Sequence, residues 1–152
     1  MFTIRPATLE DAATIAAQRR AMFRDMGYRD DRALDSMTEA FLPWVRRKMT
    51  AGEYLGWFAV SENASIAAGA GLWLMDWPPH MSGPGSRRGN ILNVYTHPGF
   101  RRQGLARRLT QTAIECCRAQ GTHTVILHAS DEGRELYRGL GFEPTNEMRR
   151  SV

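Results

Sequence analysis

One stretch of the chain, residues 89–106, reads GNILNVYTHPGFRRQGLA. Residues 89–96 form the best strand candidate in the sequence, because their apolar and β-branched composition suits a sheet. A turn carrying Arg101 and Arg102 follows, and a helix is expected to start near Arg107. The stretch therefore predicts a strand, a basic turn and a helix in direct succession.

The turn RRQGLA, residues 101–106, has the composition of an anion site. Gly104 lets the backbone come close to a ligand, and Gln103 offers an amide donor. The helix that follows presents unused amide hydrogens and the positive end of its dipole. The turn predicts a clamp for a phosphate diester. A solvated basic helix terminus is the alternative.

The segments after this turn alternate between helix and strand. The helix carries its apolar face at Leu105, Leu109, Ala113 and Cys116/Cys117 and is expected to end at Gly121. We then expect a buried strand at residues 124–128, a helix over 131–140 capped by Ser130 and ended by Gly141, and an edge strand within 142–152.

The segments before this turn predict one strand, two helices and a hairpin. Residues 2–7 form the strand, and a capping box of Thr8 and Asp11 opens a helix that stops at Gly27. A second helix is expected from Ser36, with a kink at Pro43 or a division into two short helices there. Residues 56–61 and 66–75 predict a hairpin, and residues 77–89 a long loop.

This order of elements predicts a mixed α/β sheet with helices on both faces, in a single domain of residues 1–152. With 43% hydrophobic residues the chain can build a core, and no stretch has the apolar length of a membrane span. The N-terminus lacks the pattern of a signal peptide, and Cys116 and Cys117 are adjacent, unlike a disulfide framework. We therefore expect a cytoplasmic protein that does not use a membrane.

The charge pattern favours anionic ligands without deciding among them. The net charge is +4, and Lys48 is the one lysine among 20 basic residues. The arginine pairs are scattered over different predicted elements, and no nucleic-acid-binding signature accompanies them. The four histidines and two cysteines lack metal-ligand spacing. We expect neither a nucleic-acid partner nor a metal.

From residue 89 onward the sequence resembles the GCN5-related N-acetyltransferase (GNAT) superfamily. NVYTHPGFRRQGLA is similar to that family's motif of a strand, a proline and Arg/Gln-x-x-Gly-x-Gly/Ala. HASDEGRELYRGLGF, residues 128–142, is similar to its second motif, in which a strand end precedes a helix bearing Leu-Tyr and closed by Gly-Phe. About one helix and one strand separate the two motifs, as in the family.

The resemblance implies a fold and a reaction. The fold is a mostly antiparallel sheet of six or seven strands, splayed between the strand at 89–96 and the strand at 124–128. The cofactor is acetyl-CoA, with CoA as product. The reaction is direct transfer of the acetyl group to a primary amine of a small molecule or peptide, in a ternary complex. A non-catalytic acetyl-CoA sensor is the alternative, and a homodimer stays open.

The resemblance also assigns cofactor-binding residues. The pyrophosphate loop corresponds to Arg101, Arg102, Gln103, Gly104, Leu105 and Ala106. The strand end that pairs with the pantetheine arm corresponds to Val94, Tyr95 and Thr96. Ala106 is an accepted variant of the family's second glycine. Ser130 stands where the family often has asparagine, and Gly133 where it often has alanine, which weakens the cofactor assignments at these two positions.

The catalytic assignments differ in their basis. Tyr137 matches the family's tyrosine and is expected to protonate the departing CoA thiolate, or else to pack its ring on the sheet. Asn93 interrupts an apolar run, so it is expected to hold a water or the amine, or else to link neighbouring strands. His97 and His128 are candidate bases, and the base stays open.

The acceptor site is expected in two variable segments, residues 26–35 and 77–89. Asp30 and Asp31 are candidates to attract an ammonium group, and Trp73 or Trp77 to stack on it. An ordinary polar turn and packed aromatic side chains are the alternative. The sequence names no acceptor.

Overall fold

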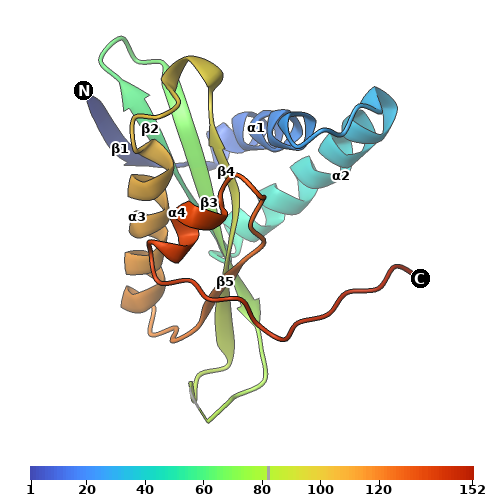
Figure 1. Ribbon diagram of the computed structural model, residues 1–152, viewed down its shortest axis with the longest axis vertical. Coiled ribbons are helices and arrows are strands. Elements are labelled where there is room, and N and C mark those ends of the chain that lie inside the picture. Colours follow the sequence, from blue (N-terminus) through green and yellow to red (C-terminus); the bar gives the residue numbers. More distant parts are fainter. Residues whose placement is uncertain (82) are drawn as a thin grey trace.

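The computed structural model describes residues 1–81 and 83–152; residue 82, in the predicted loop 77–89, lies outside the described residues. One mixed sheet forms the centre of the molecule, with its strands side by side in chain order (Figure 1). The strands are β1 (Phe2–Pro6), β2 (Tyr54–Ser61), β3 (Ile66–Asp76), β4 (Arg87–Thr96) and β5 (Val125–Leu127). The first four pair antiparallel, and β5 runs parallel to β4.

Helices cover both faces of this sheet, as the sequence predicts (Figure 1). The α-helices are α1 (Ala12–Asp25), α2 (Asp31–Thr50), α3 (Leu105–Ala119) and α4 (Arg134–Arg138), and the short 3-10 helices are η1 (Leu9–Asp11) and η2 (Pro98–Phe100). The helices α1 and α2 lie on one face and α3 on the other.

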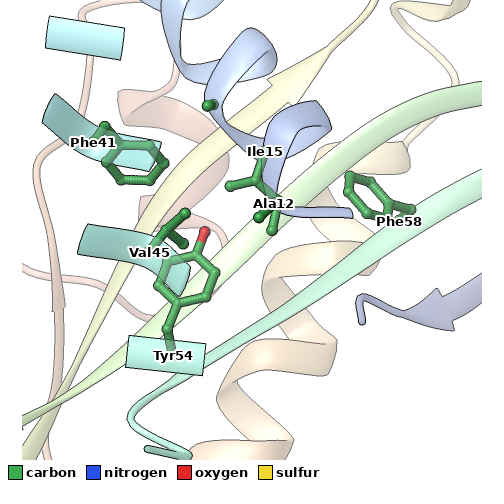
Figure 2. Close-up of a cluster of buried hydrophobic side chains, with 7 residues drawn as sticks. Ala12, Ile15, Phe41, Val45, Tyr54 and Phe58 are labelled. Carbon is green, nitrogen blue, oxygen red and sulfur yellow. The ribbon is translucent and has the colours of Figure 1, made fainter. Parts of the chain in front are cut away.

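The two faces of the sheet have different cores because side chains alternate along a strand. Phe58 of β2 packs among buried residues of α1 and α2, including Ile15 and Val45 (Figure 2). The next residue, Ala59, packs on the opposite face with Leu105 and Leu109 of α3. The α3 face of β2 and β3 is rich in alanine, which lets α3 approach the sheet closely.

A β-bulge interrupts the pairing of β3 with β4. Gly69 pairs with Tyr95 and Gly71 with Leu92, so Ala70 alone faces the two residues Asn93 and Val94. Asn93 has a left-handed backbone with φ of +57°. One extra residue in one strand bends that strand and leaves part of its ladder unpaired. The bulge therefore falls just before the predicted cofactor-binding strand end.

The parallel pairing of β4 with β5 is short. Only Gly89, Asn90 and Ile91 of β4 pair with β5, at Val125, Ile126 and Leu127. From Leu92 to Thr96, β4 continues without a β5 partner. This is the predicted splay, and it leaves the edge of the last β4 residues unpaired on that side.

The expected strand within residues 142–152 is wrong, and over the described residues, 1–81 and 83–152, the sheet has five strands rather than six or seven. The tail instead extends without regular structure away from the sheet (Figure 1). Pro144 has no amide hydrogen to give to a ladder, and the remaining residues lack an alternating apolar face. Glu147 lies near Arg88 and His128, at 4.0 Å and 3.8 Å.

The second helix is longer than expected. It begins at Asp31 rather than Ser36, because the Asp30 side chain caps it by accepting the Ala33 amide at 3.1 Å. Pro43 lies inside a continuous helix, so the division into two short helices is wrong. The tertiary packing of Phe41 and Val45 on β2 holds the turns on both sides of the proline.

The local signals at other helix ends are confirmed. Thr8 and Asp11 form the capping box, which opens η1 and leads directly into α1. Gly27, Gly121 and Gly141 follow their helices with positive φ. The helix expected over residues 131–140 is a turn followed by the short α4, and the strand expected over 124–128 is the part-buried β5.

Candidate active site

The bend between η2 and α3 presents a row of unused backbone donors. Arg102 and Gly104 both have left-handed backbones, with φ of +63° and +75°. In the part of the chain that the structure describes, the amides of residues 102–107 donate to no backbone carbonyl, and the first bond into the helix runs from Arg108 to the Gly104 carbonyl. Successive amides in such a bend form an anion-binding concavity.

The space above Gly104 is open. A Cβ atom added at Gly104 would meet no other heavy atom within 4 Å. A ligand can therefore approach this backbone directly, and the left-handed conformation favours glycine at the position. The residues of the bend fit a diphosphate group, and the cofactor contacts expected of residues 101–106 stay a prediction.

The Arg101 side chain is already engaged. Its Nε donates to the Thr96 carbonyl at 3.1 Å, and its guanidinium forms an ion pair with Asp25 at the end of α1. These contacts join the end of α1, the end of β4 and the bend. Arg101 therefore supports the shape of the loop through its side chain.

The strand end Val94–Thr96 follows the bulge and is half-buried. The pKa of Tyr95 lies above its usual value because of burial and the nearby Asp25 carboxylate, and Arg101 opposes this rise. The β5 side of these residues is unpaired. An extended amide-bearing ligand suits such an edge.

Tyr137 lies on α4 with its ring against Phe142, at 6.0 Å between ring centres. A tyrosine hydroxyl is ordinarily protonated at neutral pH, and burial raises the pKa of this one further. A Cβ atom at Gly133 would lie 2.9 Å from the Tyr137 ring, which explains glycine rather than alanine there. Tyr137 therefore has the protonation state that a proton donor requires.

Ser130 caps the turn that leads into α4. Its Oγ accepts a hydrogen bond from the Gly133 amide at 3.2 Å, which closes the turn; the expected helix cap at Ser130 is wrong, because α4 starts at Arg134 with Gly133 at its N-cap. Ser130, Gly133 and Tyr137 thus lie together. Among the described residues, no hydrogen bond or ring contact joins this group to the strand end Val94–Thr96. The contact of Ser130 with a cofactor stays a prediction.

Asn93 is buried, with 4% of its surface exposed, and both ends of its amide are bonded. Its Oδ1 accepts from Arg19 of α1 at 2.8 Å, and its Nδ2 donates to the Tyr54 hydroxyl of β2 at 3.0 Å. These bonds agree with the alternative that Asn93 links neighbouring elements. Its direct catalytic role stays a prediction.

The two candidate histidines have different surroundings. His97 begins η2, and its Nδ1 accepts from the Gly99 amide at 3.4 Å. His128 is 69% exposed and lies near the tail residue Glu147. The structure gives His97 a capping role and places His128 at the surface. The identity of the base stays open.

The expected acceptor residues are occupied by local contacts. Asp30 caps α2, and Asp31 forms ion pairs with Arg20 and Arg24. Trp73 packs edge-on against Trp44, with ring centres 5.2 Å apart. Trp77 lies under the Arg88 guanidinium, 3.3 Å from its ring centre. These contacts favour structural roles for the four residues.

Two residues that the sequence analysis overlooked lie beside the bulge. Arg19 and Tyr54 both bond to Asn93, although Tyr54 is 39 positions away in the chain and Arg19 is 74. An arginine in the first helix and a tyrosine at a strand start carry no local signal for such a contact. The pairing of β2, β3 and β4 was needed to find it.

Among the described residues, which are all except residue 82, no group of three or more His, Cys, Asp or Glu side chains is placed to hold a metal ion. In the same residues, no helix combines the length and the apolar character needed to cross a membrane.

The family model of the acetyltransferase (GNAT) family matches residues 16–142. The chain belongs to the GNAT family. Acetyl transfer that depends on acetyl-CoA is the general reaction of this family, and the sequence resemblance is thereby confirmed. The comparison with curated proteins gives no match.

Solved structures show the same relationship. A GCN5-related N-acetyltransferase from Ralstonia eutropha is 35% identical with a TM-score of 0.92, over 100% of this chain and 99% of that chain. A predicted acetyltransferase from Clostridium acetobutylicum, solved with acetyl-CoA, is 26% identical with a TM-score of 0.89, over 100% and 96%. Glucosamine-6-phosphate N-acetyltransferase from Arabidopsis thaliana, 18% identical with a TM-score of 0.72 over 100% and 98%, shares the fold.

Proposed function

We propose that this GNAT protein transfers the acetyl group of acetyl-CoA to a primary amine by direct attack in a ternary complex. The observation that carries the proposal is the bend at residues 101–106, where unused amides surround an open glycine. The similar protein from Clostridium acetobutylicum, solved with acetyl-CoA, supports the choice of cofactor.

The amides of residues 102–107 would hold the diphosphate, and the unpaired β4 edge at Val94, Tyr95 and Thr96 would hold the pantetheine arm. Acetyl-CoA supplies an activated acetyl thioester. An amide near the bulge, at Val94 or Tyr95, would stabilise the negative charge that develops on the carbonyl oxygen. Ser130 is a further candidate contact.

The chemistry requires two proton movements. As the amine nitrogen bonds to the carbonyl carbon and the carbon–sulfur bond breaks, Tyr137 would give its proton to the sulfur. The Tyr137 hydroxyl carries that proton at neutral pH, as a tyrosine ordinarily does, and burial raises its pKa further. The amine must lose a proton, and an alkylamine with a pKa near 10 is about 0.1% neutral at pH 7. A water path or a side chain would accept it.

The proposed acceptor is a small-molecule or peptide amine, bound near residues 26–35 and 77–89. The proposal also includes a location in the cytoplasm, without nucleic acid or membrane partners. The alternative is a non-catalytic acetyl-CoA sensor. It would use the same bend but would not require the Tyr137 proton.

An amine screen separates the two functions. Purified protein, acetyl-CoA and panels of amino acids, polyamines, aminoglycosides and peptides are mixed, and release of free thiol is followed. We expect one amine class to raise thiol release well above hydrolysis, with an acetylated product in mass spectrometry. Tight binding of acetyl-CoA by calorimetry without any turnover would favour the sensor, and no binding at millimolar concentration would reject both.

A further inference from the structure

The bulge in β4 has an energetic cost that its neighbours must offset. Asn93 adopts the left-handed conformation, with φ of +57°, which is unfavourable for an L-residue. Asparagine tolerates it better than most residues, but a buried amide also needs partners for both its ends. Strained backbone of this kind persists where surrounding contacts determine it, and it gathers at functional sites.

Tyr54 reaches the bulge by crossing a neighbouring strand. It belongs to β2, yet its hydroxyl bonds to Asn93 of β4, with β3 lying between them. Gly71 of β3 makes the crossing possible, because a Cβ atom there would lie 2.0 Å from the Tyr54 hydroxyl. Figure 2 shows Tyr54 rising from its strand into the buried cluster below α1 and α2.

Arg19 approaches the same amide from α1. Its guanidinium lies between the rings of Phe23 and Phe41, at 4.9 Å and 5.0 Å from their centres, and donates to Asn93. Its Nε is buried and has no hydrogen-bond partner among the described residues. Burying an arginine with an unbonded Nε costs free energy. The hydrogen bond from Arg19 to Asn93 therefore differs from a bond between two solvated side chains at the surface.

The space under the bulge is small and partly polar. A cavity of about 10 Å³ is lined by residues that include Gln18, Tyr54 and Asn93. This is close to the smallest cavity that holds one water molecule. The bulge is therefore backed by nearly complete packing, which restricts how far Asn93 can move.

We propose that Arg19, Tyr54 and Asn93 form a lock, hereafter the bulge lock, that positions the amides of Val94 and Tyr95 for acetyl transfer. The inference rests on the proposed function. The lock determines where β4 curves. This curvature separates β4 from β5 and sets the direction of the strand end Val94–Thr96. Arg19 and Tyr54 are positioning residues, since they act through the backbone at Asn93.

The test compares four variants with the wild type. Tyr54→Phe removes the hydroxyl and keeps the ring, while Asn93→Gly keeps a relaxed left-handed backbone and removes both amide bonds. Gly71→Ala displaces the Tyr54 hydroxyl without changing any residue of the lock. Gly121→Ala is the control, because this glycine after α3 has a positive φ of +70° and a Cβ there would meet nothing within 4 Å, so the variant adds backbone strain without touching the lock.

We expect Tyr54→Phe, Asn93→Gly and Gly71→Ala to lower kcat about tenfold, with KM for acetyl-CoA changed less than about twofold. Misplaced amides of Val94 and Tyr95 stabilise the transition state less, whereas the diphosphate site is unaffected. Gly121→Ala should keep kcat within about twofold of the wild type. Crystal structures should show the register of β3 and β4 altered in Tyr54→Phe. Wild-type kcat in Tyr54→Phe and Asn93→Gly would overturn the lock, as would equal losses in Gly121→Ala and Gly71→Ala.

The structural measurement separates this inference from the proposed function. If the wild type acetylates no amine, the proposed function fails, and the crystal structure of Tyr54→Phe still decides whether the hydroxyl holds the bulge. An unchanged bulge in that structure would overturn the lock. A fall in kcat and acetyl-CoA affinity by the same factor would also overturn it, because it would indicate general disruption of the fold.

Discussion

Gly104 and Gly121 have nearly the same left-handed backbone, with φ of +75° and +70°, at the two ends of α3. A Cβ atom at either position would meet nothing within 4 Å. The two residues therefore differ in function rather than in local geometry: Gly104 lies in the bend of unused amides, and Gly121 ends the helix. This matched pair separates ligand binding from conformational strain.

Gly104→Ala should weaken acetyl-CoA binding at least about tenfold, because the new methyl group and the strained turn both disturb the amides of the bend. Isothermal calorimetry measures the dissociation constant. Gly121→Ala should lose a similar free energy of unfolding, about 1 kcal/mol, with acetyl-CoA affinity unchanged. Equal loss of affinity in both variants would contradict a diphosphate site at the bend.

Tyr137→Phe should lower kcat at least about tenfold and leave KM for acetyl-CoA nearly unchanged, since it removes a proton donor that acts on the leaving sulfur. The ring and its contact with Phe142 are kept, so the melting temperature should change little. Steady-state kinetics with the best amine of the screen measures the effect. Full activity would remove Tyr137 from the mechanism and leave the ring-packing role.

At the scale of elements, the junction of β1 with α1 depends on one carboxylate. Arg5 donates two hydrogen bonds to Asp11, at 2.8 Å and 2.9 Å, and the Thr8 amide donates another at 2.8 Å. The Arg5 bonds are the largest cause of the fall in the pKa of Asp11 from 3.8 to about 2. The carboxylate thus ties the first strand to the first helix.

Asp11→Asn should lower the free energy of unfolding by about 1 kcal/mol at pH 7. The expected loss is this small because Arg5 is partly exposed and solvent screens its ion pair with Asp11. Because folding depresses the pKa of Asp11, its contribution is present above pH 3.8 and is lost as the pH falls toward about 2. Urea unfolding at several pH values should show the two proteins converging in acid. A constant difference down to pH 2 would exclude the ionised pair as the cause.

At the scale of the whole molecule, the proposed site depends on parts from distant regions of the chain. The bend, the unpaired β4 edge and α4 come from residues 87–138, while α1 and β2 support them from behind. The Asp25–Arg101 ion pair further joins α1 to the bend. A ligand that binds this site therefore stabilises contacts across most of the fold.

Acetyl-CoA at a hundred times its dissociation constant should raise the free energy of unfolding by about 2.7 kcal/mol, because it binds the folded chain alone. A rise in melting temperature measured by calorimetry reports the effect. The rise should persist in Gly121→Ala and fall to about half, about 1.4 kcal/mol, or less in Gly104→Ala at the same ligand concentration. An equal rise in both variants would place the ligand elsewhere.

Local signals explain why much of the fold was predictable. The Thr8–Asp11 box and the glycines after α1, α3 and α4 act within a few residues, so the sequence contains the whole interaction. The start of α2 and the tail show where such signals fail. Asp30 was an equally good cap that the apolar pattern did not reveal, and the final residues lack a partner that would make them a strand.

The sequence by itself determined the order of the elements as far as α4, the glycine-bearing turn before α3 and the family, because each depends on contiguous residues. Only the tertiary structure decided that Arg101 pairs with Asp25 and that Asn93 is held by Arg19 and Tyr54. Those contacts require the order of strands in the sheet, which brings together side chains that are far apart along the chain. The energy of each contact depends on two residues far apart in the sequence, so no short stretch of sequence encodes it.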